Sequence, residues 1–81
     1  MSEAKYQSKL IKQLEADGWY VLKLIKTNKN GIPDVLALKD GHKPYFIEVK
    51  GAKGKLSELQ KYRLKELKDY GFNAEAKFEP I

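Results

Sequence analysis

A predicted β-hairpin in the middle of the chain constrains the fold more than any other feature. The apolar segments VLAL and YFIEVK lie on either side of Asp40-Gly41, a dipeptide that is typical of tight turns. We therefore expect two antiparallel strands, at about 34–39 and 44–50, joined by this turn.

The hairpin gathers charged side chains on one face. Because side chains alternate between the two faces of a strand, Glu48 and Lys50 point one way while Ile47 and Val49 point toward the core. Asp34, at the head of the first strand, approaches Glu48 if the strands pair. Two carboxylates together at the edge of an apolar sheet are unfavourable unless a cation shares them. A hard divalent metal ion with oxygen ligands is the simplest occupant.

The composition bounds the class of protein. With 81 residues we expect one domain, residues 1–81, whose small core a partner subunit would extend. The absence of cysteine excludes a disulfide framework and a thiolate zinc site. No apolar stretch approaches the roughly 18 residues of a membrane span, and the N-terminus is not a signal peptide, so we expect a cytoplasmic protein that binds no membrane.

The charge balance favours a polyanionic partner. Sixteen Lys and Arg against eleven Asp and Glu give a net charge of +5 and a pI near 9.4. Such a surface favours nucleic acid, although many small basic domains bind nothing in particular.

The remaining segments predict two helices and two further strands. Periodic apolar residues, a Gly after each helix and branched or aromatic runs define them. In order they are a helix at 2–17, a strand at 19–25, a polar loop at 27–31, the hairpin, a basic loop at 51–55, a helix at 57–71 and a strand at 72–78. The order αβββαβ predicts an α/β fold with a mixed central sheet.

Context makes the acidic motif specific. The triplet Glu-x-Lys occurs four times, but only at Glu48 does it follow a Pro-Asp partner, lie in an apolar strand and precede a glycine that lets backbone approach a ligand. The segments GIPD (31–34) and IEVKG (47–51) resemble the motif of the PD-(D/E)XK nuclease superfamily and, within it, the VRR-NUC domain family. The archaeal-type Holliday junction resolvases share this fold and motif.

Both predicted helices extend the resemblance. The family's first helix carries a Glu with a Gln one turn later, which is similar to Glu3 and Gln7. Its second helix opens with a Ser/Gln pattern, which is similar to Ser57 and Gln60. The resemblance therefore covers nearly the whole chain in the correct order.

The resemblance implies a restriction-endonuclease-like domain that hydrolyses DNA with Mg²⁺ or Mn²⁺ and needs no nucleotide cofactor. It implies that the carboxylates of Asp34 and Glu48 and the main-chain carbonyl of Val49 hold the metal, with Glu3 as a further ligand. Lys50 would orient the attacking water or stabilise the transition state. By the same resemblance Gln60 is a catalytic candidate and Gln7 a possible accessory residue.

The resemblance also implies a structure-selective endonuclease of replication, repair or recombination, with a phage among the possible sources. We expect a homodimer that cuts branched DNA such as a four-way junction. Two alternatives stay open: a nucleic-acid-binding module on the same fold without hydrolysis, and a structural association domain.

Each strand residue of the motif also has a structural interpretation. Asp34 after a proline could be a strand-entry residue, and Glu48 with Lys50 could be a surface pair of little energetic value. Glu3 would be favoured in the first turn of a helix by the helix dipole alone.

The remaining candidates have similar alternatives. Gln60 completes a capping box with Ser57 whether or not it meets a substrate, and His42 is expected to be a solvated turn residue. Five lysines should border the catalytic strands and contact phosphates without reading bases, or form a solvated charged surface: Lys23, Lys26, Lys29, Lys53 and Lys55.

Overall fold

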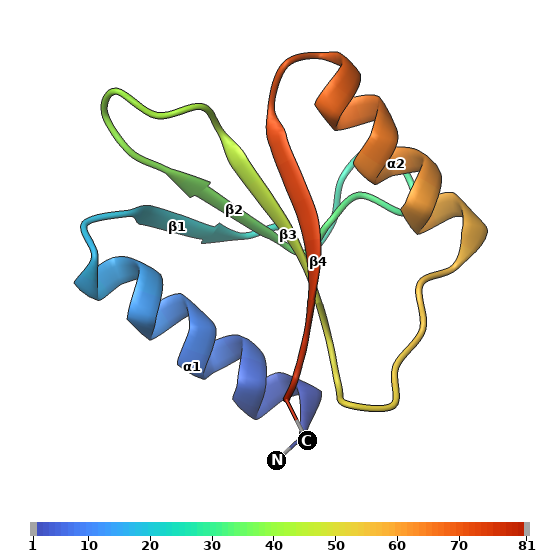
Figure 1. Ribbon diagram of the computed structural model, residues 1–81, viewed down its shortest axis with the longest axis horizontal. Coiled ribbons are helices and arrows are strands. Elements are labelled where there is room, and N and C mark those ends of the chain that lie inside the picture. The colour runs from blue at the N-terminus through green and yellow to red at the C-terminus, as the bar shows by residue number, and fades with distance from the viewer. Residues whose placement is uncertain (1, 81) are drawn as a thin grey trace.

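A four-stranded mixed sheet with a helix against each face forms the structure, a computed structural model that describes residues 2–80 (Figure 1). The elements are α1 (Glu3–Ala16), β1 (Tyr20–Lys23), β2 (Val35–Leu38), β3 (Tyr45–Lys50), α2 (Glu58–Asp69) and β4 (Asn73–Phe78). The strands lie in the order β1-β2-β3-β4, with β3 and β4 parallel and the other neighbours antiparallel. The predicted α/β fold, its order αβββαβ and its mixed sheet are confirmed.

The first helix covers one face of the sheet. The Ser2 side chain accepts a hydrogen bond from the Lys5 N–H at 3.2 Å and so caps the N-terminus of α1. Leu10 is the buried residue of this helix, and it packs in one cluster with Val35 and Ile47. The odd-numbered residues of β2 and β3 therefore form the core beneath α1.

The second helix covers part of the opposite face. The Gln60 N–H donates to Ser57 Oγ at 3.1 Å, and the Ser57 N–H donates to Gln60 Oε1 at 2.9 Å, so the capping box is formed. Leu64 and Leu67 pack with Ala74 in a second buried cluster. This helix therefore lies over β4 and the neighbouring part of β3 (Figure 1).

Two expectations about the strands need correction. The strand predicted at 19–25 spans only Tyr20–Lys23, because the chain beyond it turns toward α2, where Arg63 Nε donates to the Asn30 carbonyl at 2.8 Å. The charged cluster was expected at the edge of the sheet, but Glu48 and Lys50 lie on β3, which has a neighbour on both sides. The parallel partner β4 arrives through α2, a long-range pairing that periodicity does not reveal.

A glycine makes the close contact between α2 and the loop before β2 possible. Gly31 has φ +80°, and a Cβ added to it would lie 2.6 Å from Leu59 Cγ. Gly41 has a similar φ of +76° but faces open space. An alanine at Gly41 would therefore cost only the strain of a left-handed backbone, whereas an alanine at Gly31 would cost this strain and a steric clash.

We expect Gly31→Ala to lower the free energy of unfolding by about 2–4 kcal/mol, and Gly41→Ala by about 1 kcal/mol. Urea denaturation of both variants measures the difference. Because the extra loss at Gly31 comes from Leu59, the double variant Gly31→Ala/Leu59→Ala should lose less than the sum of its single changes. Equal losses for the two glycines would contradict the clash.

Candidate functional site

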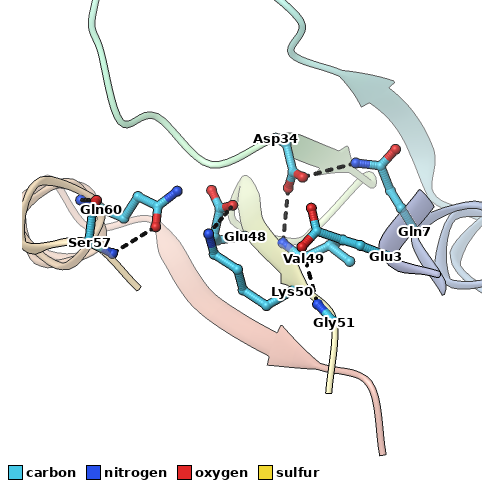
Figure 2. A network of polar contacts seen from close by, with 9 residues as sticks. All are labelled: Glu3, Gln7, Asp34, Glu48, Val49, Lys50, Gly51, Ser57 and Gln60. Carbon is cyan, nitrogen blue, oxygen red and sulfur yellow. Dashed lines mark hydrogen bonds and ion pairs between the residues drawn. The ribbon is translucent and has the colours of Figure 1, made fainter. Parts of the chain in front are cut away.

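The predicted acidic residues meet where β2 begins and β3 ends. The register pairs Val35 with Ile47, so the next position places Asp34 opposite Glu48. Figure 2 shows Glu3 and Gln7 of α1 on one side of this pair and Ser57 and Gln60 of α2 on the other (Figure 2). The first turns of both helices therefore flank the two carboxylates.

Hydrogen bonds hold both oxygens of the Asp34 carboxylate. The Val49 N–H donates to Asp34 Oδ1 at 3.0 Å, and Gln7 Nε2 donates to Asp34 Oδ2 at 2.9 Å. Extending the register by one more pair would place Pro33 opposite Val49. Since proline has no N–H, the ladder between β2 and β3 cannot continue normally there, and the Asp34 side chain takes the Val49 donor instead.

The same register leaves the Val49 carbonyl without a strand partner at this position. The Pro44 and Lys50 carbonyls accept from the Asn73 and Glu79 N–H groups on the β4 side, both at 2.9–3.0 Å. Neighbouring carbonyls in a strand alternate in direction, so the Val49 carbonyl points toward the β2 side. Pro33 offers it no donor.

Burial makes the ionised form of the Glu48 carboxylate unfavourable. Glu48 is only 6% exposed, and Lys50 Nζ lies 3.9 Å from its Oε2. Desolvation, with the nearby charges of Asp34 and Glu3, raises the pKa of Glu48 from 4.5 to about 7, although Lys50 acts in the opposite direction. The lysine therefore offsets only part of the cost of this buried acid.

The Asp34 pKa is raised for a similar reason. Desolvation by burial raises it most, the hydrogen bonds from Val49 and Gln7 oppose this, and the charge of Glu3 raises it further. Glu3 itself is exposed, and its Oε1 accepts the Gly51 N–H at 3.2 Å. Three carboxylates therefore influence one another here, one of them from the first turn of α1.

The donor set suits a hard cation with few protein ligands. Among residues 2–80 there is no group of three or more His, Cys, Asp or Glu side chains arranged to hold a metal ion. The available oxygens are the carboxylates of Asp34 and Glu48 and the Val49 carbonyl. Mg²⁺ typically keeps several waters beside one or two carboxylates, so this set fits it, and a cation there would relieve the unfavourable charge at Glu48.

Comparison with known families decides the relationship of this chain. The family model of the VRR-NUC domain matches residues 2–77, nearly the whole sequence. The chain belongs to the VRR-NUC family. The comparison with curated proteins gives no match. Membership in VRR-NUC places the chain among nuclease-type proteins, and DNA is the corresponding class of substrate.

The other predicted VRR-NUC residues lie at different distances from the carboxylates. Gln60 is held in the capping box, yet its side chain points from α2 toward Glu48 (Figure 2). Lys26 and Lys29 line a hollow of about 210 Å³ in the loop between β1 and β2. Lys23, Lys53 and Lys55 are exposed, on β1 and in the loop after β3. The hollow lined by Lys26 and Lys29 does not include these three lysines.

The structure also places two further predicted residues, His42 and Gly51. His42 is exposed, as expected for a turn, and its ring lies 5.2 Å from that of Trp19, far along the sheet from Glu48. A glycine was expected at position 51 to allow close approach of the backbone. A Cβ at Gly51 would meet only Glu3 Cβ at 3.9 Å, an ordinary contact, so the protein itself does not require glycine there.

Sequence analysis missed Arg63, and it used Pro33 as part of the motif without foreseeing the effect of its missing N–H. Arg63, 15% exposed in its side chain, donates to the Asn30 carbonyl and pairs with Glu66 at 2.9 Å, and so fixes the loop that leads into Asp34. It is the one arginine of the chain, which was an available signal. Pro33 is fully buried, and its missing N–H became meaningful only with the register. No helix among residues 2–80 is long and apolar enough to span a bilayer.

Gln7 should tune metal binding through Asp34. Replacing it in Gln7→Met removes the donor to Asp34 Oδ2 while keeping the length of the side chain, so we expect Mn²⁺ to bind about 10-fold more weakly. Isothermal titration with Mn²⁺ measures the change. Gln13→Met, at an exposed position of the same helix, is the matched control and should bind as the wild type does. Equal affinities in the two variants would remove Gln7 from the site.

The raised pKa of Glu48 predicts that this acid destabilises the metal-free fold. The pKa of Glu48 is higher in the folded than in the unfolded state. The free energy of unfolding is therefore highest below about pH 4.5, where the acid is protonated in both states, and it declines as the pH rises from there through about 7. Glu48→Gln removes this loss, so at pH 8 its free energy of unfolding should exceed that of the wild type by about 2 kcal/mol. Near pH 4.5 the difference should vanish.

Denaturation in the presence of a chelator, repeated across this pH range, tests the prediction. Glu15→Gln, which changes an exposed acid on α1, is the control and should show no comparable pH-dependent gain. A Glu48→Gln variant less stable than wild type at pH 8 would contradict the electrostatic account.

Proposed function

We propose that residues 1–81 form a single VRR-NUC domain that acts as a Mg²⁺- or Mn²⁺-dependent endodeoxyribonuclease. The observation that carries this proposal is the convergence of Asp34, Glu48 and the free side of the Val49 carbonyl, with Lys50 on the same strand face. A buried acid beside a half-buried one, with too little positive charge nearby, is the arrangement that a divalent cation stabilises.

In this proposal Asp34, Glu48 and the Val49 carbonyl hold the metal. The bound ion supplies charge stabilisation at the phosphoryl oxygens and a water that ionises near neutral pH. Gln7 orients the Asp34 carboxylate by donating a hydrogen bond to it. Glu3, whose carboxylate accepts the Gly51 N–H, is a further ligand of the metal.

Lys50 is the positively charged side chain of the proposed centre. Its Nζ, 3.9 Å from Glu48, lies where it can orient the attacking water or donate to a phosphate oxygen as negative charge develops. The Gln60 amide, which points toward Glu48, offers a second donor from α2 (Figure 2). The capping box fixes the position of that amide without consuming its Nε2.

The basic loops would hold the DNA backbone. Lys26 and Lys29 share one hollow beside the loop that enters β2, and three more lysines, Lys23, Lys53 and Lys55, are exposed at the same end of the strands as Asp34 and Glu48. Lysine contacts to phosphates give affinity without base readout. We therefore propose recognition of DNA shape, with binding that weakens as the salt concentration rises.

We further propose that the active form is a cytoplasmic homodimer that cuts branched DNA. The small core supports this, because the buried apolar residues are few and come from both sheet faces. A two-fold symmetric dimer carries two centres, which matches opposing strands of a four-way junction. Such substrates arise in replication, repair and recombination.

Substitutions at the centre separate metal binding from catalysis. Asp34→Asn keeps the shape but removes a ligand charge, and should abolish both cleavage and Mn²⁺ binding in a protein that still folds. Lys50→Ala should lower turnover about 100-fold while Mn²⁺ binding persists. Lys68→Ala, at an exposed position of α2, is the control. Wild-type cleavage by Asp34→Asn, or loss of metal binding in Lys50→Ala, would refute these roles.

A panel of end-labelled substrates tests the activity and its selectivity. Junction, flap, duplex and single-stranded DNA are incubated with Mg²⁺, with Mn²⁺ and with chelator. We expect nicks on paired strands of the junction and little cutting of linear duplex, only with metal. Metal-independent binding without cleavage would favour the non-catalytic module, and absence of both metal and DNA binding would favour the structural association domain.

A further inference from the structure

One isoleucine in the loop between β1 and β2 is almost completely exposed. Ile25 is 90% exposed, the highest value among the large apolar residues of the described chain, residues 2–80. The residues at 27–31, TNKNG, are polar or small, as expected of a loop, because Asn and Gly favour turns. Burial of an isoleucine side chain is favourable, so Ile25 leaves an apolar contact open to a ligand.

The backbone that carries Ile25 distinguishes it from other exposed apolar residues, which are common singly on protein surfaces. The N–H of the preceding residue, Leu24, donates to the main-chain carbonyl of Asp34 at 2.9 Å. Ile25 is therefore one residue away from a direct contact with a proposed metal ligand. Nucleic acid bound at the carboxylates lies within reach of this side chain.

Two further contacts hold the same loop in place. Thr27 Oγ1 donates to the Lys29 carbonyl at 2.7 Å. Arg63 Nε donates to the Asn30 carbonyl at 2.8 Å, so the loop passes beside α2 (Figure 1). A side chain on a loop that is already held loses little conformational freedom when it meets a ligand.

Lysines surround this isoleucine. Lys23, Lys26 and Lys29 are exposed, and the last two line the hollow of about 210 Å³ together with Ile25. A phosphate held by Lys26 and Lys29 would bring the attached sugar and base toward Ile25. An apolar tip with a basic rim matches DNA, which is anionic along its backbone and apolar between its bases.

We propose that Ile25 is an apolar wedge that enters the base stack of DNA next to the phosphate to be cut. The inference rests on the proposed function, because it assigns a specificity-determining residue to the same centre. Isoleucine is one of the side chains that proteins insert between base steps, where they unstack and kink the DNA. Unstacking costs least where the stack is already interrupted, so the wedge favours branch points, nicks and bulges over continuous duplex.

Base unstacking can be measured without cleavage. A four-way junction carries 2-aminopurine, a base analogue whose fluorescence rises on unstacking, at one position at a time beside the branch point, and is titrated with protein in chelator. The wild type should raise the fluorescence at a position beside the branch and bind the junction about 10-fold more tightly than linear duplex. Ile25→Ser should remove the fluorescence rise and bind the two DNAs about equally, whereas Ile25→Leu should keep both properties.

Two further variants separate the wedge from charge and from general surface effects. Ile25→Lys adds a positive charge, so a loop that acts by charge alone would bind DNA more tightly and leave the fluorescence rise unchanged, whereas the wedge requires that the rise be lost. Tyr70→Ser is the matched control, because Tyr70 is 74% exposed but lies at the C-terminal end of α2. It should behave as the wild type does. Circular dichroism checks that each variant is folded.

Several outcomes overturn the inference. They are a wild type that changes the fluorescence at no position, an Ile25→Ser or Ile25→Lys variant that keeps the rise, and a Tyr70→Ser variant that loses it equally. Cleavage with Mg²⁺ or Mn²⁺ judges the nuclease proposal separately. Unstacking by a protein that never cuts retains the wedge and counts against the nuclease, whereas metal-dependent cutting with an unchanged junction preference in Ile25→Ser counts against the wedge alone.

Discussion

The hydrogen bond from the Val49 N–H to the Asp34 carboxylate is the interaction on which the site depends. It is possible because Pro33, at the opposite register position, has no N–H and cannot continue the ladder. The side chain of Asp34 replaces a backbone partner, so the carboxylate is fixed to the end of β3 rather than left to rotate. The same proline offers no donor to the Val49 carbonyl, which points toward the β2 side because carbonyls alternate along a strand. One buried proline therefore helps to place two of the three oxygen groups assigned to the metal.

The electrostatics of this arrangement oppose stability and favour ligand binding. Glu48 is buried on an interior strand beside Asp34, and burial raises the pKa values of both acids. Lys50 lies 3.9 Å from Glu48 and reduces the cost without removing it. A protein selected only for stability would replace these acids with neutral residues. The presence of these acids in an otherwise apolar sheet has a physical explanation if a cation completes the charge balance, as we propose for this nuclease-type protein of the VRR-NUC family.

The sequence predicted the elements and the acidic group well, because both depend on short-range periodicity. Alternation along residues 45–50 and the Asp40-Gly41 turn determine which side chains share a face, so Asp34, Glu48 and Lys50 converge as expected. Features that depend on long-range packing were not predictable. The central position of β3 follows from β4 returning through α2, and the role of Arg63 follows from its contact with Asn30. The close approach of backbone to a ligand that we expect at Gly51 stays a prediction, because the protein itself leaves room for a Cβ there.

The two helices cover the two faces of the sheet unequally, and this determines where the site lies. α1 closes one face over Val35 and Ile47, so that face can only contribute stability. α2 lies over β4 and the neighbouring part of β3, and reaches no further across the other face. At the strand ends, half-buried Asp34 therefore lies beside buried Glu48, and farther along β1 the side chains of Tyr20 and Leu22 are exposed. A second helix shifted toward β1 would bury these apolar side chains but would also cover Asp34 and Glu48, so the access of a ligand to the two carboxylates depends on how far α2 extends across the sheet.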